Sequence, residues 1–89
     1  MGRGIKRTFA EAMELPKESI LNLPLLTMLG REELFIENYK GIIEYSDETV
    51  RISTGIGVLK IEGRGLFLKS ILPESITLMG TFTAVQYIN

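Results

Sequence analysis

Three glutamates stand in segments that alternate between apolar and polar residues, and they are the side chains best suited to acid–base or metal chemistry. Glu37, Glu44 and Glu62 each occupy a polar position of such a segment. A carboxylate cluster would need raised pKa values or a bound cation to act there. Arg51, Lys60 and Lys69 stand at polar positions nearby and favour cross-strand ion pairs instead. We therefore expect no catalytic or metal site, and a small ligand-binding or enzymatic β-barrel using this carboxylate cluster is the alternative interpretation.

Other residues with catalytic potential are missing or stand in the wrong context. The 89 residues contain no histidine and no cysteine, which removes the usual base for a serine nucleophile, thiolate metal ligands and disulfides. Gly55-x-Gly57 and Gly63-x-Gly65 resemble fragments of phosphate-binding loops, but a dinucleotide site needs a longer glycine pattern between a strand and a helix. Both glycine pairs lie between expected strands. We expect hairpin glycines, a protein that is not an enzyme, and no cofactor.

The charge balance limits the classes of partner. Ten basic and 11 acidic residues give a formal net charge of −1, whereas nucleic-acid binding favours a strongly basic face, so we expect no nucleic-acid partner. Residues 1–7 form an expected flexible basic tail, in which Arg3, Lys6 and Arg7 would make at most weak contact with an anionic membrane surface. The tail is not followed by the apolar stretch of a secretory signal, and the absence of cysteine fits a cytosolic protein.

The elements that must position these residues are short β-strands. A two-residue alternation of apolar and other residues recurs from Leu34 to Tyr87 and predicts strands with one apolar face. The expected strands cover residues 34–37, 42–45, 50–53, 58–62, 66–70, 76–79 and 82–88, preceded by extended pieces at 19–23 and 25–28. Gly63-Arg64-Gly65 is expected to be the tightest reversal. Connections this short place neighbouring strands antiparallel.

One short helix is expected before the strands. Thr8-Phe9-Ala10-Glu11 matches a capping box, and Pro16 ends the helical segment about two turns later. Residues 8–89 would then form a single β domain with this short N-terminal helix. The unequal spacing of the apolar phrases favours a curled antiparallel meander, a small β-roll or sandwich, over a β-solenoid, which would keep a fixed period.

The apolar residues divide into an expected core and a candidate contact surface. The expected core comprises Leu34, Ile36, Ile43, Val50, Ile52, Leu59, Ile61, Leu66, Leu68, Ile76 and Leu78, with some of Phe82, Ala84 and Val85. The candidate contact surface comprises Phe35, Tyr45, Phe67, Phe82 and Tyr87. These aromatic residues lie on the nominally polar side or near strand ends, so they either pack under the chain's own helix or meet a partner. The terminal strand 82–88 offers an edge for a homo-oligomer or another protein.

Two sequence stretches carry specific motifs. The first runs from Leu15 to Gly30 and contains the motif L-N-L-P, and the second is the motif I-E-N-x-x-G-I-x-x-Y at residues 36–45. Together they resemble the YabP/YqfC family of sporulation proteins, most closely its YqfC branch. Weaker similarity continues through residues 50–52, 57–63 and 76–80. Asn38, Gly41 and Tyr45 match the family pattern, although turn geometry explains Asn38 and Gly41 equally well.

The resemblance implies a function that the residues alone do not indicate. It implies a non-enzymatic protein that acts by protein–protein contact in spore morphogenesis, at the cortex or coat, with a sporulation membrane protein as partner. It also implies a location in the cytoplasm of the mother cell, in association with the forespore surface. The family supplies no catalytic residues to transfer to this chain.

Overall fold

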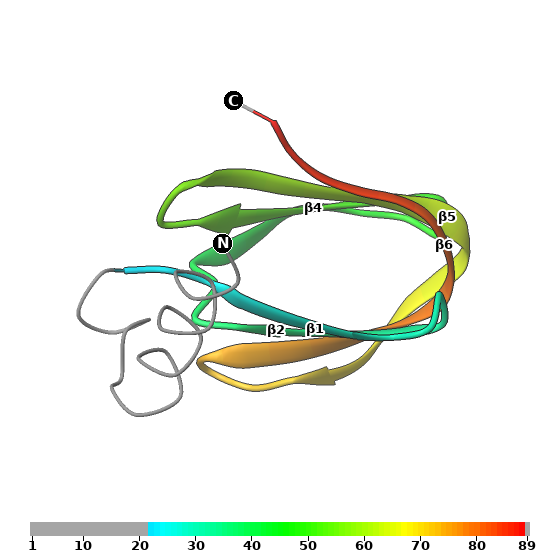
Figure 1. Cartoon of the computed structure of the whole chain (residues 1–89), viewed down its shortest axis with the longest axis horizontal. Helices are drawn as coiled ribbons and strands as arrows, with labels where there is room; N and C mark the ends of the chain where they lie inside the picture. Colours follow the sequence, from blue (N-terminus) through cyan, green and yellow to red (C-terminus); the bar gives the residue numbers. More distant parts are fainter. Residues whose placement is uncertain (1–21, 89) are drawn as a thin grey trace, which may run out of the picture.

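A computed structural model describes residues 22–88 of the chain as a β-sheet folded into two layers (Figure 1). The expected basic tail and N-terminal helix lie outside the described residues. The strands are β1 (Leu25–Leu29), β2 (Glu33–Glu37), β3 (Gly41–Tyr45), β4 (Thr49–Thr54), β5 (Gly57–Ile71) and β6 (Ser75–Ile88). The prediction of an all-β fold is confirmed for this part of the chain.

All strand pairs are antiparallel, in the order β1-β2-β6-β5-β4-β3. The two long strands pair with each other and run through both layers (Figure 1). Layer I contains β3, β4, residues 57–62 of β5 and residues 84–88 of β6. Layer II contains β1, β2, residues 75–79 of β6 and residues 67–71 of β5. Consecutive strands β2 and β3 do not pair, because the chain passes between layers at residues 38–40.

The prediction of a reversal at Gly63-Arg64-Gly65 was wrong. Residues 57–71 form one continuous strand that bends there, and the register between β5 and β6 shifts on both sides of the bend. A Cβ atom at Gly63 would clash with the carbonyl oxygen of Thr81 on the neighbouring strand, and one at Gly80 would lie against Gly65. Glycine is therefore required because two backbones approach closely at a sheet corner.

The core lies between the two layers and largely matches the sequence prediction. Its fully or almost fully buried side chains are Leu34, Ile36, Val50, Ile52, Leu59, Ile61, Leu66, Ile76, Leu78 and Phe82. Leu68 and Val85 are half-buried against it. The prediction for Ile43 was wrong, since its side chain is 49% exposed. The strand register shifts between Ile42 and Glu44, so a β-bulge breaks the alternation at Ile43.

The core residues show that both layers follow one pairing scheme. In layer II, Leu34 lies opposite Leu78 and Ile36 opposite Ile76. In layer I, the corresponding pairs are Val50 with Ile61 and Ile52 with Leu59. The connectivity therefore has an approximate two-fold relation that exchanges β1 with β3, β2 with β4, and β5 with β6.

The hairpin turns obey the same relation. In the β1–β2 turn, the carbonyls of Glu32 and Arg31 accept hydrogen bonds from Gly80 and Phe82 at 3.2 and 2.8 Å. In the β3–β4 turn, the carbonyls of Glu48 and Asp47 accept from Gly63 and Leu66 at 3.0 and 2.9 Å. Each hairpin is thus attached by its turn to the corner where β5 and β6 bend.

Candidate contact surface

The outer face of layer II carries apolar side chains from three strands. Leu34 and Ile36 point into the core, so Phe35 between them points outward. Phe35 lies opposite Thr77 of β6, and Met79 of β6 lies opposite Phe67 of β5. Cross-strand partners share a sheet face, so these four side chains occupy one surface.

This surface extends to the edge of the sheet. Leu25 and Leu29 of β1 lie opposite Glu37 and Glu33 of β2, which are on the same outer face as Phe35. Phe67 is 50% exposed and Leu29 is 54% exposed, while Phe35 and Met79 are half-buried. We call the set Leu25, Leu29, Phe35, Phe67 and Met79 the apolar outer face.

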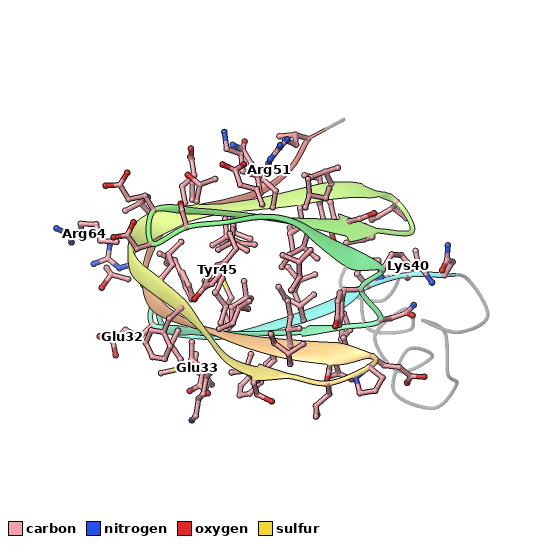
Figure 2. All side chains as sticks on the ribbon, turned by 180° about the vertical axis from the view of Figure 1, so that it is seen from behind. Glu32, Glu33, Lys40, Tyr45, Arg51 and Arg64 are labelled. Carbon is pink, nitrogen blue, oxygen red and sulfur yellow. The ribbon has the colours of Figure 1, made fainter. Side chains whose placement is uncertain are left out.

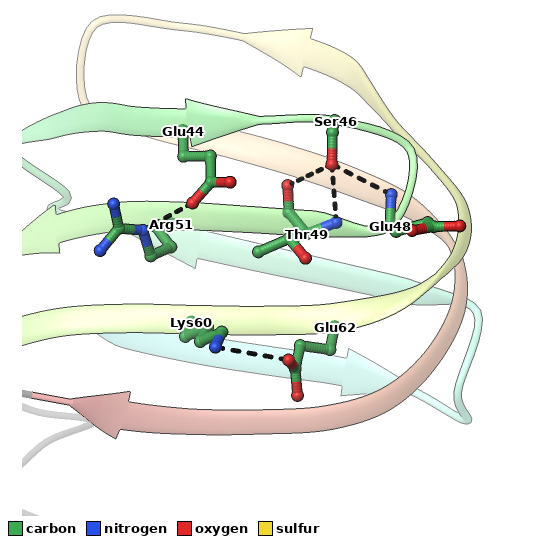
Figure 3. A network of polar contacts seen from close by, with 7 residues as sticks. All are labelled: Glu44, Ser46, Glu48, Thr49, Arg51, Lys60 and Glu62. Carbon is green, nitrogen blue, oxygen red and sulfur yellow. Dashed lines mark hydrogen bonds and ion pairs between the residues drawn. The ribbon is translucent and has the colours of Figure 1, made fainter.

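The outer face of layer I carries charged side chains at the two positions that correspond to Phe35 and Met79. Arg51 corresponds to Phe35, and its Nε donates to Oε1 of Glu44 at 2.7 Å (Figure 3). Glu62 corresponds to Met79, and its Oε2 lies 3.4 Å from Nζ of Lys60. The Glu44–Arg51 pair is a cross-strand ion pair of the kind that the sequence predicted, whereas Lys60 and Glu62 lie in the same strand, β5. Both pairs are partly exposed, so each contributes little to stability.

The three glutamates of the alternative interpretation do not converge on a cavity. Glu44 and Glu62 are on the outside of layer I, each beside a cation, whereas Glu37 is exposed on the outside of layer II. Within residues 22–88 there is no group of three or more acidic or other ligating side chains able to hold a metal ion. The geometry therefore offers no common site for these carboxylates.

Two tyrosines link the layers along the side where β3 faces the second half of β5. Tyr45 lies between the layers (Figure 2), and its hydroxyl accepts a hydrogen bond from the N–H of Leu68 at 3.1 Å. The Tyr39 hydroxyl donates to the carbonyl of Leu72 at 2.9 Å. Tyr45 thus contributes to closing the fold, although half of its side chain is exposed.

The five aromatic residues of the candidate contact surface do not form one patch. Phe35 and Phe67 lie together on the apolar outer face. Tyr45 and Tyr87 lie on opposite edges of layer I, and partial burial raises the pKa of Tyr87 above its usual value. The assignment of Phe82 to the contact surface was wrong, because Phe82 is only 2% exposed, and its alternative assignment to the core is confirmed.

The sequence prediction of this surface omitted three of its members. Met79 and Leu25 were placed in expected extended segments without being selected for the surface, and Leu29 was placed in no expected element. Their shared face depends on the pairing of β1 with β2 and of β2 with β6. Alternation along one strand cannot reveal that pairing.

Comparisons with known proteins decide the family. The model of the YabP family matches residues 23–89. The chain belongs to the YabP/YqfC family. It is 37% identical over 84 residues to "Uncharacterized protein YqfC" of Bacillus subtilis (strain 168), an alignment that covers 94% of this chain and 90% of that protein. The YabP/YqfC family is associated with sporulation, and the family prediction made from the two motifs is confirmed.

Two further findings concern structure. The comparison with solved structures found no match. Among residues 22–88, no helix has the length and apolar character needed to cross a membrane.

Proposed function

We propose that this YabP/YqfC protein acts without enzymatic activity, by protein–protein contact, in the morphogenesis of the spore cortex or coat. Its apolar outer face would dock on a sporulation membrane protein, from the cytoplasm of the mother cell at the forespore surface. The family association supports the setting in sporulation. The residues of the surface support the mode of action, because exposed Phe67 and Leu29 and half-buried Phe35 gain burial on binding.

One observation carries the proposal. The two layers bury equivalent core positions, yet Arg51 and Glu62 on layer I correspond to Phe35 and Met79 on layer II. Layer I shows that charged residues satisfy the fold at these outer positions. Apolar residues at the equivalent positions of layer II are therefore not needed to form the sheet, and contact with a partner explains them.

The experiment compares Phe67→Glu with Ala84→Lys in the endospore-forming host. A lysine at residue 84 would lie opposite Glu62, whereas a glutamate there would oppose a like charge. Phe67 of layer II lies opposite Met79, and Ala84 of layer I lies opposite Glu62. Because Met79 and Glu62 occupy equivalent positions, Phe67 and Ala84 are equivalent outer positions as well. We expect Phe67→Glu to lower the number of heat-resistant spores toward that of a deletion strain, because a buried carboxylate disrupts an apolar contact. Ala84→Lys should sporulate normally. Both purified variants should unfold at the temperature of the wild-type protein.

The proposal would be contradicted if the deletion strain failed to sporulate while Phe67→Glu sporulated as well as the wild type. It would also be contradicted if the two variants impaired sporulation equally, because the effect would then not depend on the apolar outer face.

A further inference from the structure

Strand β1 is an edge strand without the features that usually prevent pairing with another chain. Within residues 22–88 it pairs with β2 alone, and that register has no shift. The strand Leu25–Leu29 contains no charged residue, and Leu25, Met28 and Leu29 are 47%, 42% and 54% exposed. A flat, uncharged and apolar edge is a template for another strand.

The equivalent edge, β3, is protected in three ways. A β-bulge between Ile42 and Glu44 interrupts its ladder. Glu44 places a charge on the edge at the position that corresponds to Thr27 of β1. Tyr45, which corresponds to Met28, extends its hydroxyl to Leu68 of the opposite layer. Natural sheets use bulges, charges and covering groups to prevent edge pairing. Strand β3 has these features at the equivalent edge, so the fold can accommodate a protected edge strand. The fold therefore does not require β1 to lack such protection.

The turn after β1 shows which of its backbone groups are available. The carbonyl of Leu29 accepts a hydrogen bond from the N–H of Glu32 at 3.3 Å, so it points toward β2. Backbone groups of successive strand residues point to alternate sides. Leu25 and Thr27 therefore also direct their backbone groups to β2, whereas Leu26 and Met28 direct theirs to the free edge.

The residues of β1 are complementary to a second copy of β1. From these observations we infer that two copies of the chain pair antiparallel through β1, with Thr27 on the two-fold axis. Leu25 then lies opposite Leu29 of the second copy, Leu26 lies opposite Met28, and Thr27 lies opposite Thr27. Threonine pairs and apolar pairs are favourable across strands, and no like charges oppose each other.

This pairing is an isologous dimer interface. Leu26 and Met28 form the hydrogen-bonded rungs, and Thr27 forms a non-hydrogen-bonded pair, in which the side chains are closest. Pro24 has no N–H group, so it ends the ladder just before β1. The dimer places the two apolar outer faces on one continuous sheet, which would enlarge the proposed contact surface. The biological purpose of the dimer rests on the proposed function.

A single cysteine tests the register because the chain has none of its own. Thr27→Cys would place two thiols opposite each other, at the Cβ separation of a non-hydrogen-bonded pair, which suits a disulfide. Glu44→Cys is the matched control on the equivalent edge. After mild oxidation of the purified full chain, the variants are compared on a denaturing, non-reducing gel. We expect Thr27→Cys to run as a covalent dimer and Glu44→Cys to run as a single chain.

Light scattering on the wild-type protein supplies the independent readout. We expect a mass of twice the 10.0 kDa chain. Thr27→Lys should return the mass to that of one chain, because it opposes two positive charges on the axis, and Thr27 is exposed, so the fold should survive. Circular dichroism of Thr27→Lys checks the fold.

The inference is overturned if the wild-type protein is a monomer up to high concentration, a result that would point to residues 1–21 or a different protein as the occupant of β1. It is also overturned if Thr27→Cys and Glu44→Cys cross-link equally, or if Thr27→Lys remains a folded dimer. Phe67→Glu should stay a dimer. A monomer that still loses sporulation through Phe67→Glu would remove this inference and leave the proposed function intact.

Discussion

The two layers of this protein bury equivalent apolar side chains in the core but carry different side chains on their outer faces. Val50 and Ile52 of layer I bury their side chains as completely as Leu34 and Ile36 of layer II. On the outside, layer I carries the Glu44–Arg51 ion pair, whereas layer II carries Phe35 at the position equivalent to Arg51. Packing of the core therefore fixes the inward residues of both layers, and it leaves the outward residues free to serve another purpose.

The largest expected effect concerns the core, where equivalent buried side chains of the two layers should contribute equally to the free energy of unfolding. Ile36→Ala and Ile52→Ala truncate equivalent, fully buried side chains, one in each layer. Each substitution should lower the free energy of unfolding by about 2–5 kcal/mol, through lost burial and the cavity that is left. Urea denaturation of the two purified variants measures both values. Exposed Ile43→Ala is the control and should change stability by less than about 0.5 kcal/mol.

A large difference between the two truncations would show that the two layers do not contribute equally to the core. If Ile36→Ala were nearly neutral while Ile52→Ala unfolded the protein, layer II would not share the core with layer I. The apolar outer face would then be part of a loosely packed layer rather than a surface on a stable one.

The smallest expected effect concerns the charged outside of layer I. Glu44→Gln removes the carboxylate that pairs with Arg51 across the sheet surface. Because both side chains are partly exposed, the free energy of unfolding should fall by only about 0.2–1 kcal/mol. Thermal unfolding in low salt and in 1 M salt measures the loss, which should shrink in high salt as the charges are screened. A loss of several kcal/mol that persists in salt would show that layer I needs its charges to fold.

Sequence alternation was sufficient to identify most of the buried core residues. It identified Leu34, Ile36, Val50 and Ile52 as core residues, because a period of two assigns faces without knowledge of strand order. Residue type also identified the turn at Asn38, where the structure has a left-handed backbone with a φ of 63°. Alternation failed at Ile43, where a bulge adds one residue and reverses the expected face.

The corner was the main failure, and the cause is physical. Gly63-Arg64-Gly65 has the composition of a tight turn, and a single strand gives no sign of what lies beside it. The glycine at 63 serves instead to admit the backbone of Thr81 from a strand distant in sequence. Phe82 was assigned to both the core and the contact surface for the same reason, because a terminal strand looks like a free edge until its first residues are seen to pack at the corner.

The contact surface was predicted only in part. Phe35 and Phe67 were selected as aromatic residues at polar positions, and the structure brings them to one face. Tyr45 and Tyr87 met the same criterion, but they lie at the two edges of layer I. Residue type identifies aromatic side chains at positions that are expected to face solvent. The strand register determines which of these side chains lie together on one face.

The most direct test of the central claim is site-specific photo-cross-linking in sporulating cells. A photoreactive amino acid would replace Phe67 on the apolar outer face, and in a second strain Ala84 at the equivalent position of layer I. We predict that residue 67 forms a covalent adduct with one discrete membrane protein and that residue 84 forms none. Adducts from residue 84 alone, or the same adducts from both positions, would contradict the assignment of layer II as the contact surface.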